Sequence, residues 1–92
     1  MEMLMFVIRD NKASSFSPRP FFEKNRVDAI RGLTAAVNYH DGQIKDFPSD
    51  FDMYQLGSFD PQTGKVKLSE QPEFIIGASS CVVTKEKNKE DS

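Results

Sequence analysis

Hydrophobic residues recur in short runs separated by polar stretches, and each run predicts one structural element. Residues 3–8 are apolar at every position, which is typical of a central strand covered on both faces. Residues 11–20 contain three serines and two prolines, and this composition predicts an extended loop. The adjacent Phe21 and Phe22 mark the return to the core, because neighbouring residues of an extended segment point to opposite sides.

A single amphipathic helix is predicted from about residue 26 to residue 38. Asn25 followed by Asp28 is a helix-start signal, since an asparagine side chain accepts from a free backbone N–H and a carboxylate is favourable near the helix N-terminus. Apolar positions at three-to-four spacing form a stripe expected to face the sheet. The stripe consists of Val27, Ile30, Leu33 and Val37, with Ala29 and Ala36 beside it. The outer face is expected to carry Arg26, Asp28, Arg31 and Thr34.

The clearest hairpin joins a β-like run over residues 53–59 to another over residues 65–69. Its turn reads Asp60-Pro61-Gln62-Thr63-Gly64. Asp bonds its own turn backbone, Pro presets φ, and Gly relieves a position of positive φ. On the second strand Val66 and Leu68 share one face opposite a wet, lysine-bearing face. Pro72 is expected to end this strand.

The elements combine into an α+β prediction. One more strand, interrupted near Gly77, is expected from residues 74–76 and 81–83. Residues 1–84 are therefore expected to form a single α+β domain, in which a small, mostly antiparallel sheet carries one amphipathic helix on one face and a C-terminal β-hairpin. Residues 85–92 contain no apolar residue to offset the entropic cost of ordering, so a disordered charged tail is expected.

Composition limits the classes of protein. The 92 residues, 38% hydrophobic, provide for one core. One Cys and one His exclude an intramolecular disulfide and a His/Cys metal cage, and Cys81 is predicted to be a small buried hydrophobe. The apolar run over residues 3–8 is far shorter than the roughly 20 residues of a membrane helix, and its flanks do not match a secretory signal. We expect a cytoplasmic protein without a membrane segment.

Titratable residues suggest no reaction. Asp46, Asp50 and Asp52 are close in sequence, and carboxylates suit hard cations, but their spacing lacks the central Gly and final Glu of an EF-hand loop. Turn caps and a solvated loop are favoured, so no metal or other cofactor is expected. His40 follows the predicted helix end, where an imidazolium meets the negative end of the dipole. No nucleophile with a partnering base is identified, and a nonenzymatic protein is expected.

Several fragments occur in a characteristic order. Residues 46–64 contain a proline and aspartates, then a tyrosine, Leu-Gly, an aromatic with aspartate, and Thr-Gly. The other fragments are Arg9-Asp10, Lys12-Ala13, Pro20-Phe21-Phe22 and Ala29-Ile30-Arg31. In these fragments, which span about residues 4–76, the chain resembles the small nonstructural protein of microviruses, especially the gokushovirus branch of single-stranded-DNA bacteriophages. The serine-rich stretch around residues 14–17 lies outside the pattern.

The resemblance implies a function class. It implies a non-virion protein made in the cytoplasm of the infected bacterium, with a role around single-stranded DNA or the move from genome replication to packaging. It carries no enzymatic motif, so no catalytic residue is transferred.

Charge is divided along the chain. The formal charge of −2 and the pI near 5.3 exclude the whole-molecule basic field of a strong nucleic-acid binder. Residues 9–31, however, hold six basic against three acidic residues, a net +3, whereas residues 41–73 hold three against seven, a net −4. Phenylalanines interleave with the basic residues, as a single-strand binder requires. The predicted nucleic-acid-binding residues are Arg9, Lys12, Phe16, Arg19, Lys24, Arg26 and Arg31.

Each of these residues also has a plainer interpretation. Phe21 and Phe22 can belong to the core while the basic residues solvate a surface, which leaves Phe16 as the best exposed stacking residue. Tyr54 and Phe59 can form a stacking platform, yet simple alternation places them on opposite faces of their strand, which favours core packing of at least one.

Two hypotheses about function follow from these observations. The first is a sequence-tolerant single-stranded-DNA-binding accessory protein. The second is an interaction module that binds a phage or host replication factor through the hairpin and the acidic connection, without DNA contact. Exposed sheet edges favour a homodimer in either case.

Overall fold

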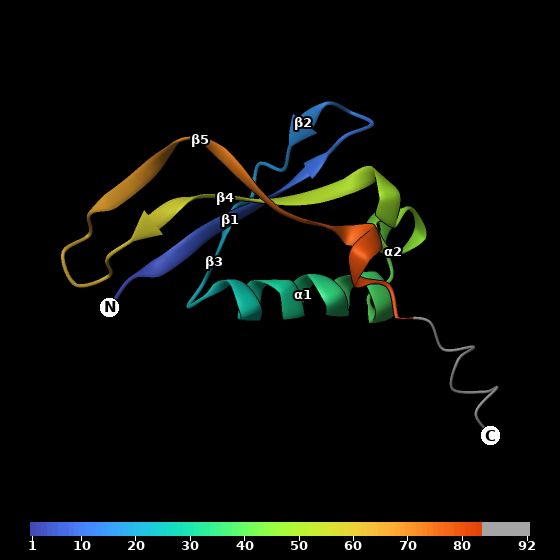
Figure 1. Cartoon of the computed structure of the whole chain (residues 1–92), viewed down its shortest axis with the longest axis horizontal. Coiled ribbons are helices and arrows are strands. Elements are labelled where there is room, and N and C mark those ends of the chain that lie inside the picture. The colour runs from blue at the N-terminus through green and yellow to red at the C-terminus, as the bar shows by residue number, and fades with distance from the viewer. Residues whose placement is uncertain (84–92) are drawn as a thin grey trace, which may run out of the picture.

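The computed structural model describes residues 1–83, so the tail predicted over residues 85–92 lies outside the described residues. Its elements are β1 (Met3–Asp10), β2 (Ser15–Phe16), β3 (Phe21–Glu23), α1 (Arg26–Tyr39), α2 (Gln43–Asp46), β4 (Phe51–Phe59) and β5 (Val66–Gly77), with 3-10 turns η1 (Pro48–Asp50) and η2 (Ala78–Cys81). The strands form one antiparallel sheet in the order β2-β1-β4-β5, with β3 also paired to β1. Helix α1 lies along one side of this sheet (Figure 1). The predicted α+β fold is confirmed.

Strand β1 occupies the centre of the sheet. It pairs with β4 along its whole length on one side, and with β3 and β2 on the other. Phe6 and Val7, which point to opposite faces, are both buried. The prediction of a strand covered on both faces is therefore confirmed at its middle.

The stretch predicted as an extended loop contains β2, a two-residue strand. Asp10 Oδ1 accepts hydrogen bonds from the backbone N–H groups of Lys12 and Ala13 at 3.0 and 3.1 Å, and Ser14 turns the chain with a φ of 56°. Phe16 consequently pairs with Arg9. A short-range carboxylate turn thus returns the serine-rich stretch to the edge of the sheet.

The core lies between α1 and the sheet. Its buried members are Phe6, Ala29, Leu33, Val37, Phe51, Met53, Ala78 and Cys81. The helix begins where predicted, with Asn25 Oδ1 accepting from the backbone N–H of Asp28 at 2.8 Å, and the burial of Cys81 is confirmed.

The rotation of α1 differs from the prediction. Leu33 and Val37 of the predicted stripe are buried and Ile30 packs against the core, but Val27, expected in the same stripe, is 60% exposed. The sheet-facing positions are 29, 33 and 37, and Arg26, three residues before Ala29, shares that face. Arg26, expected on the outer face of the helix, is therefore turned toward the sheet, where it contacts Gln55 and Glu73.

The hairpin turn is confirmed. Gly64 has a φ of +77°, and the backbone N–H of Asp60 donates to Lys65 O at 2.9 Å. Asp60 Oδ1 accepts from the backbone N–H of Gln62 at 2.9 Å, and this hydrogen bond lowers the pKa of the Asp60 carboxyl below its usual 3.8.

The shifted pKa predicts a pH dependence for Asp60→Ala. Because the folded-state pKa is depressed, the carboxylate contributes stability above about pH 4, and this contribution is lost as the pH falls through the folded value. The difference in urea midpoint between the wild type and Asp60→Ala should be small, present at pH 7 and smaller at pH 2.5. A difference that grew on acidification would contradict the assigned hydrogen bond.

Strand β5 corrects two predictions. Pro72 does not end the strand, which runs on to Gly77. Proline is tolerated because β5 is an edge strand and Pro72 lies where its register with β4 shifts. Strand β5 bends along its length (Figure 1). Residues 81–83 are not a strand: the Asn38 side chain on α1 binds this segment, donating to Cys81 O and accepting from the backbone N–H of Val83, both at 2.9 Å.

Candidate nucleic-acid interface

A bulge in β4 decides which side chains share a face of the sheet. Met5 of β1 pairs with Gly57 and Phe6 pairs with Gln55, so Leu56 has no partner on β1. One extra residue reverses the alternation of side chains along the bulged strand. Tyr54 and Phe59, expected on opposite faces, therefore lie on the same face.

That face is the one opposite α1, and we call it the aromatic face. Tyr54 pairs with Val7 on β1 and with Phe74 on β5, and Phe59 pairs with Met3. Phe16 and Phe22 join this face because their partners are Arg9 and Met5. Within residues 1–83, the aromatic face carries Phe16, Phe22, Tyr54, Phe59 and Phe74.

The rings of the aromatic face form two groups. Tyr54 lies edge to face with Phe16 at 5.3 Å between centroids and with Phe74 at 5.8 Å, so three rings cross the sheet in a row. Phe22 and Phe59 form a second pair, also 5.8 Å apart. Phe16, Phe22 and Phe74 are exposed. This face thus offers rings to solvent, whereas Phe21 stacks on Phe6 and packs against the core on the helix side.

Arg9 places a positive charge at the end of the three-ring row. Its guanidinium carbon lies 5.2 Å from the centroid of the Phe16 ring, within the range of a cation–π interaction. Arg9 Nε donates to Asn11 Oδ1 at 2.9 Å, and Asn11 Nδ2 donates to Asp52 Oδ2 at 2.8 Å. This relay orients the guanidinium, and the described residues make no hydrogen bond to its two terminal nitrogen atoms.

The remaining predicted site residues do not all join Arg9 and Phe16. Lys12 lies in the turn between β1 and β2, Arg19 in the loop between β2 and β3, and Lys24 between β3 and α1, and all three are exposed. Arg31 lies on the side of α1 turned away from the sheet, because it is two residues from the buried Ala29 and Leu33. Arg26 and Arg31 are therefore not on the aromatic face.

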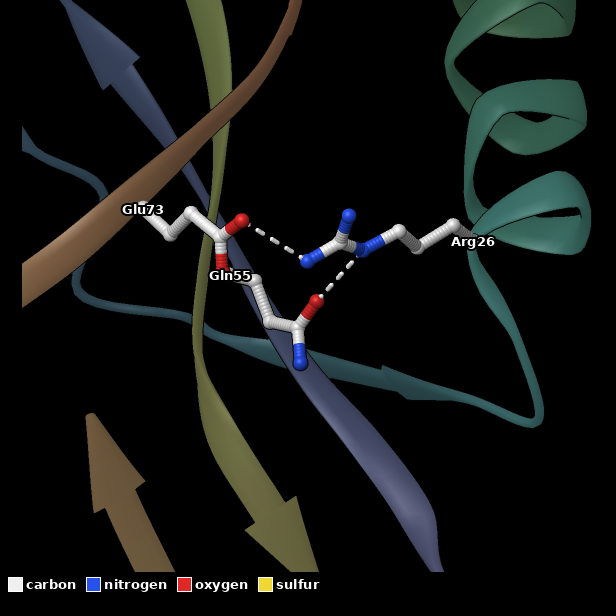
Figure 2. Close-up of polar contacts among 3 residues, drawn as sticks. All are labelled: Arg26, Gln55 and Glu73. Atoms are coloured by element: carbon white, nitrogen blue, oxygen red, sulfur yellow. Dashed lines mark hydrogen bonds and ion pairs between the residues drawn. The ribbon is translucent and has the colours of Figure 1, made fainter.

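Arg26 reaches across to the sheet from the helix side. Its Nη2 forms an ion pair with Glu73 Oε2 at 3.0 Å, and its Nε donates to Gln55 Oε1 at 2.9 Å. Figure 2 shows this side chain extended from the start of α1 to residues of β4 and β5. Both partners occupy the face behind the aromatic rings.

Sequence reasoning did not include Phe22, Tyr54, Phe59 and Phe74 in the site. One signal for Tyr54 and Phe59 was present, since an isolated glycine inside a strand pattern, such as Gly57, indicates a bulge or a close backbone approach. For Phe74 no local signal existed, because its position depends on β5 continuing through Pro72.

The described residues contain neither a cluster of metal-ligating side chains nor a membrane-spanning helix. Residues 1–83 contain no group of three or more His, Cys, Asp or Glu side chains arranged to hold a metal ion. Over the same range, no helix has both the length and the apolar character needed to span a bilayer.

The chain matches the model of a known protein family. The family model described as "Phage ORF5 protein" matches residues 3–81. No curated protein and no solved structure matches the chain.

Proposed function

Because this chain belongs to the Phage ORF5 protein family, we propose that it is a nonenzymatic bacteriophage protein that binds single-stranded DNA with little sequence preference. Bases would stack on the aromatic face, and Arg9 would meet a phosphate. The same surface would suit any exposed genome segment, since every base has a stackable face.

The observation that carries the proposal is the aromatic face with Arg9 beside it. Single-strand binders combine aromatic rings, which stack on unpaired bases, with cations that follow the backbone. Here the rings come from four strands of one sheet face that lacks a helix in the described chain, and three of them are exposed. A chain of net charge −2 needs such a local arrangement, because its overall field repels DNA.

The resemblance to the microvirus nonstructural protein supports a finer version of this proposal. In that version the protein acts in the host bacterial cytoplasm as an accessory factor in genome replication or in the switch to packaging. A homodimer would double the binding surface, which would compensate for the small number of cations on each chain.

A second function is favoured by the hairpin. Val66 and Leu68, expected on a covered strand face, are exposed, Leu68 to 71%. They pair with Phe59 and Gly57 and so extend the aromatic face with aliphatic side chains. Such an exposed apolar extension suits a protein partner, and the alternative is an interaction module that binds a phage or host replication factor without touching DNA.

Fluorescence anisotropy with labelled single-stranded and duplex DNA separates the two functions. Single-strand binding should be tighter than duplex binding and should weaken as salt rises, because phosphate contacts release counterions. Absence of single-strand binding at low salt would refute the proposal and leave the interaction module.

Arg9 and Arg31, both predicted from the sequence to bind nucleic acid, lie on different sides of the molecule. We expect Arg9→Gln to weaken single-strand binding a few-fold and to lower the slope of log affinity against log salt by about 0.7, the value for one lost phosphate contact. Arg31→Gln removes the same charge from the far side of α1 and is the matched control. Equal effects of the two substitutions would show that the aromatic face is not where the phosphates lie.

A further inference from the structure

Arg26 lies behind the ring row, and its contacts link α1 to both strands that carry Tyr54 and Phe74. It binds Gln55 and Glu73, the neighbours in sequence of those two aromatic residues. Gln55 pairs with Glu73, and Tyr54 pairs with Phe74, in adjacent positions of the same ladder. Successive strand residues point to opposite faces. The Arg26 guanidinium therefore binds Gln55 and Glu73 on the helix side of the sheet, directly behind the Tyr54 and Phe74 rings of the aromatic face.

The pairing of β4 with β5 is irregular around these two residue pairs. The register between β4 and β5 shifts on one side between Met53 and Tyr54 and on the other between Gln55 and Gly57. The two pairs thus form a short island between two irregularities, and pairing resumes only beyond them, at Met53 with Ile76 and at Gly57 with Leu68. A side-chain contact from α1 therefore has most influence on the angle between β4 and β5 at these two pairs.

We propose that Arg26 is a positioning residue for the aromatic face: by clamping Gln55 and Glu73 from α1, it holds Tyr54 and Phe74 at their edge-to-face contact. This inference rests on the proposed function for its binding consequence. It replaces the predicted role of Arg26 as a phosphate contact, since its guanidinium is directed to the opposite side of the sheet (Figure 2).

Glu73 makes the inference testable. If charge alone mattered, Glu73→Gln would strengthen DNA binding by removing a negative charge, and Arg26→Gln would weaken it and lower the salt slope. If Arg26 positions the rings, both substitutions should weaken single-strand binding about two- to five-fold, as expected for losing one exposed ion pair. The salt slope should stay unchanged, and the double variant should bind no worse than either single variant.

The experiment combines that binding assay with NMR of the full chain. We expect ring-to-ring NOEs between Tyr54 and Phe74 to weaken in Arg26→Gln and in Glu73→Gln but not in Arg31→Gln, which changes the same helix and the same charge without touching the strands. Tighter binding by Glu73→Gln, or unchanged NOEs in both variants, would overturn the inference. If the wild type binds no single-stranded DNA, the proposed function fails by itself, and the NOEs alone decide whether Arg26 positions the rings.

Discussion

Gly57→Ala should lower the free energy of unfolding by about 3 kcal/mol or more, because a side chain there has no room. A Cβ at position 57 would lie 2.0 Å from Lys67 O and 2.9 Å from Leu68 Cα. Both are backbone atoms of the paired strand, so relief requires β4 and β5 to separate. The loss would be a large share of the roughly 5–15 kcal/mol that stabilises a small domain. Urea unfolding followed by far-UV circular dichroism measures it, since the chain contains no tryptophan.

The matched control is a second glycine to alanine change in the same chain. Gly32 lies exposed within α1, and a Cβ there would meet nothing within 4 Å. Gly32→Ala should therefore raise stability by about 0.5–1 kcal/mol through helix propensity. If Gly57→Ala unfolded at the wild-type urea concentration, the close approach of β4 and β5 at Gly57 would be wrong.

Phe74→Ala should weaken single-strand binding by roughly 1–3 kcal/mol, which is about 5- to 150-fold. Phe74 is the most exposed ring of the aromatic face, at 55%, and its removal also takes away the edge-to-face support of Tyr54. Because a half-exposed side chain contributes less to the core, the fold should persist. Anisotropy gives the affinity, and circular dichroism shows whether the secondary structure is retained.

Phe47→Ala is the control for that loss. Phe47 is as exposed as Phe74, at 59%, but it lies between α2 and η1, outside the strands that carry the aromatic face. Its removal should leave single-strand affinity unchanged. Equal losses for the two variants would mean that binding depends on general surface hydrophobicity, and an undiminished affinity of Phe74→Ala would remove the three-ring row from the site.

These variants are expected to change single-strand affinity and the free energy of unfolding to different extents. Gly57→Ala acts on the pairing of β4 with β5, and so it should reduce both quantities. Phe74→Ala should reduce binding far more than stability. The combination tests the close approach of β4 and β5 separately from the role of the aromatic face in binding.

Local hydrogen bonding explains what the sequence predicted well. The start of α1 depends on Asn25 and Asp28, three residues apart, and the hairpin turn on Asp60, Gln62 and Gly64. Such features are decided within one turn of chain, so residue type and spacing are enough to find them. Runs of apolar residues likewise identified β1 as central, because a strand apolar on both faces has to be covered on both.

The sequence by itself therefore determined the α+β class, the helix start, the hairpin turn and the basic stretch that contains Arg9 and Phe16. Only the tertiary structure decided which side chains share a face. The bulge at Leu56, the passage of β5 through Pro72 and the rotation that turns Arg26 toward the sheet all depend on partners far away in sequence. A one-residue shift moves a side chain to the opposite face of a strand, and strand periodicity alone cannot show where long-range pairing imposes that shift.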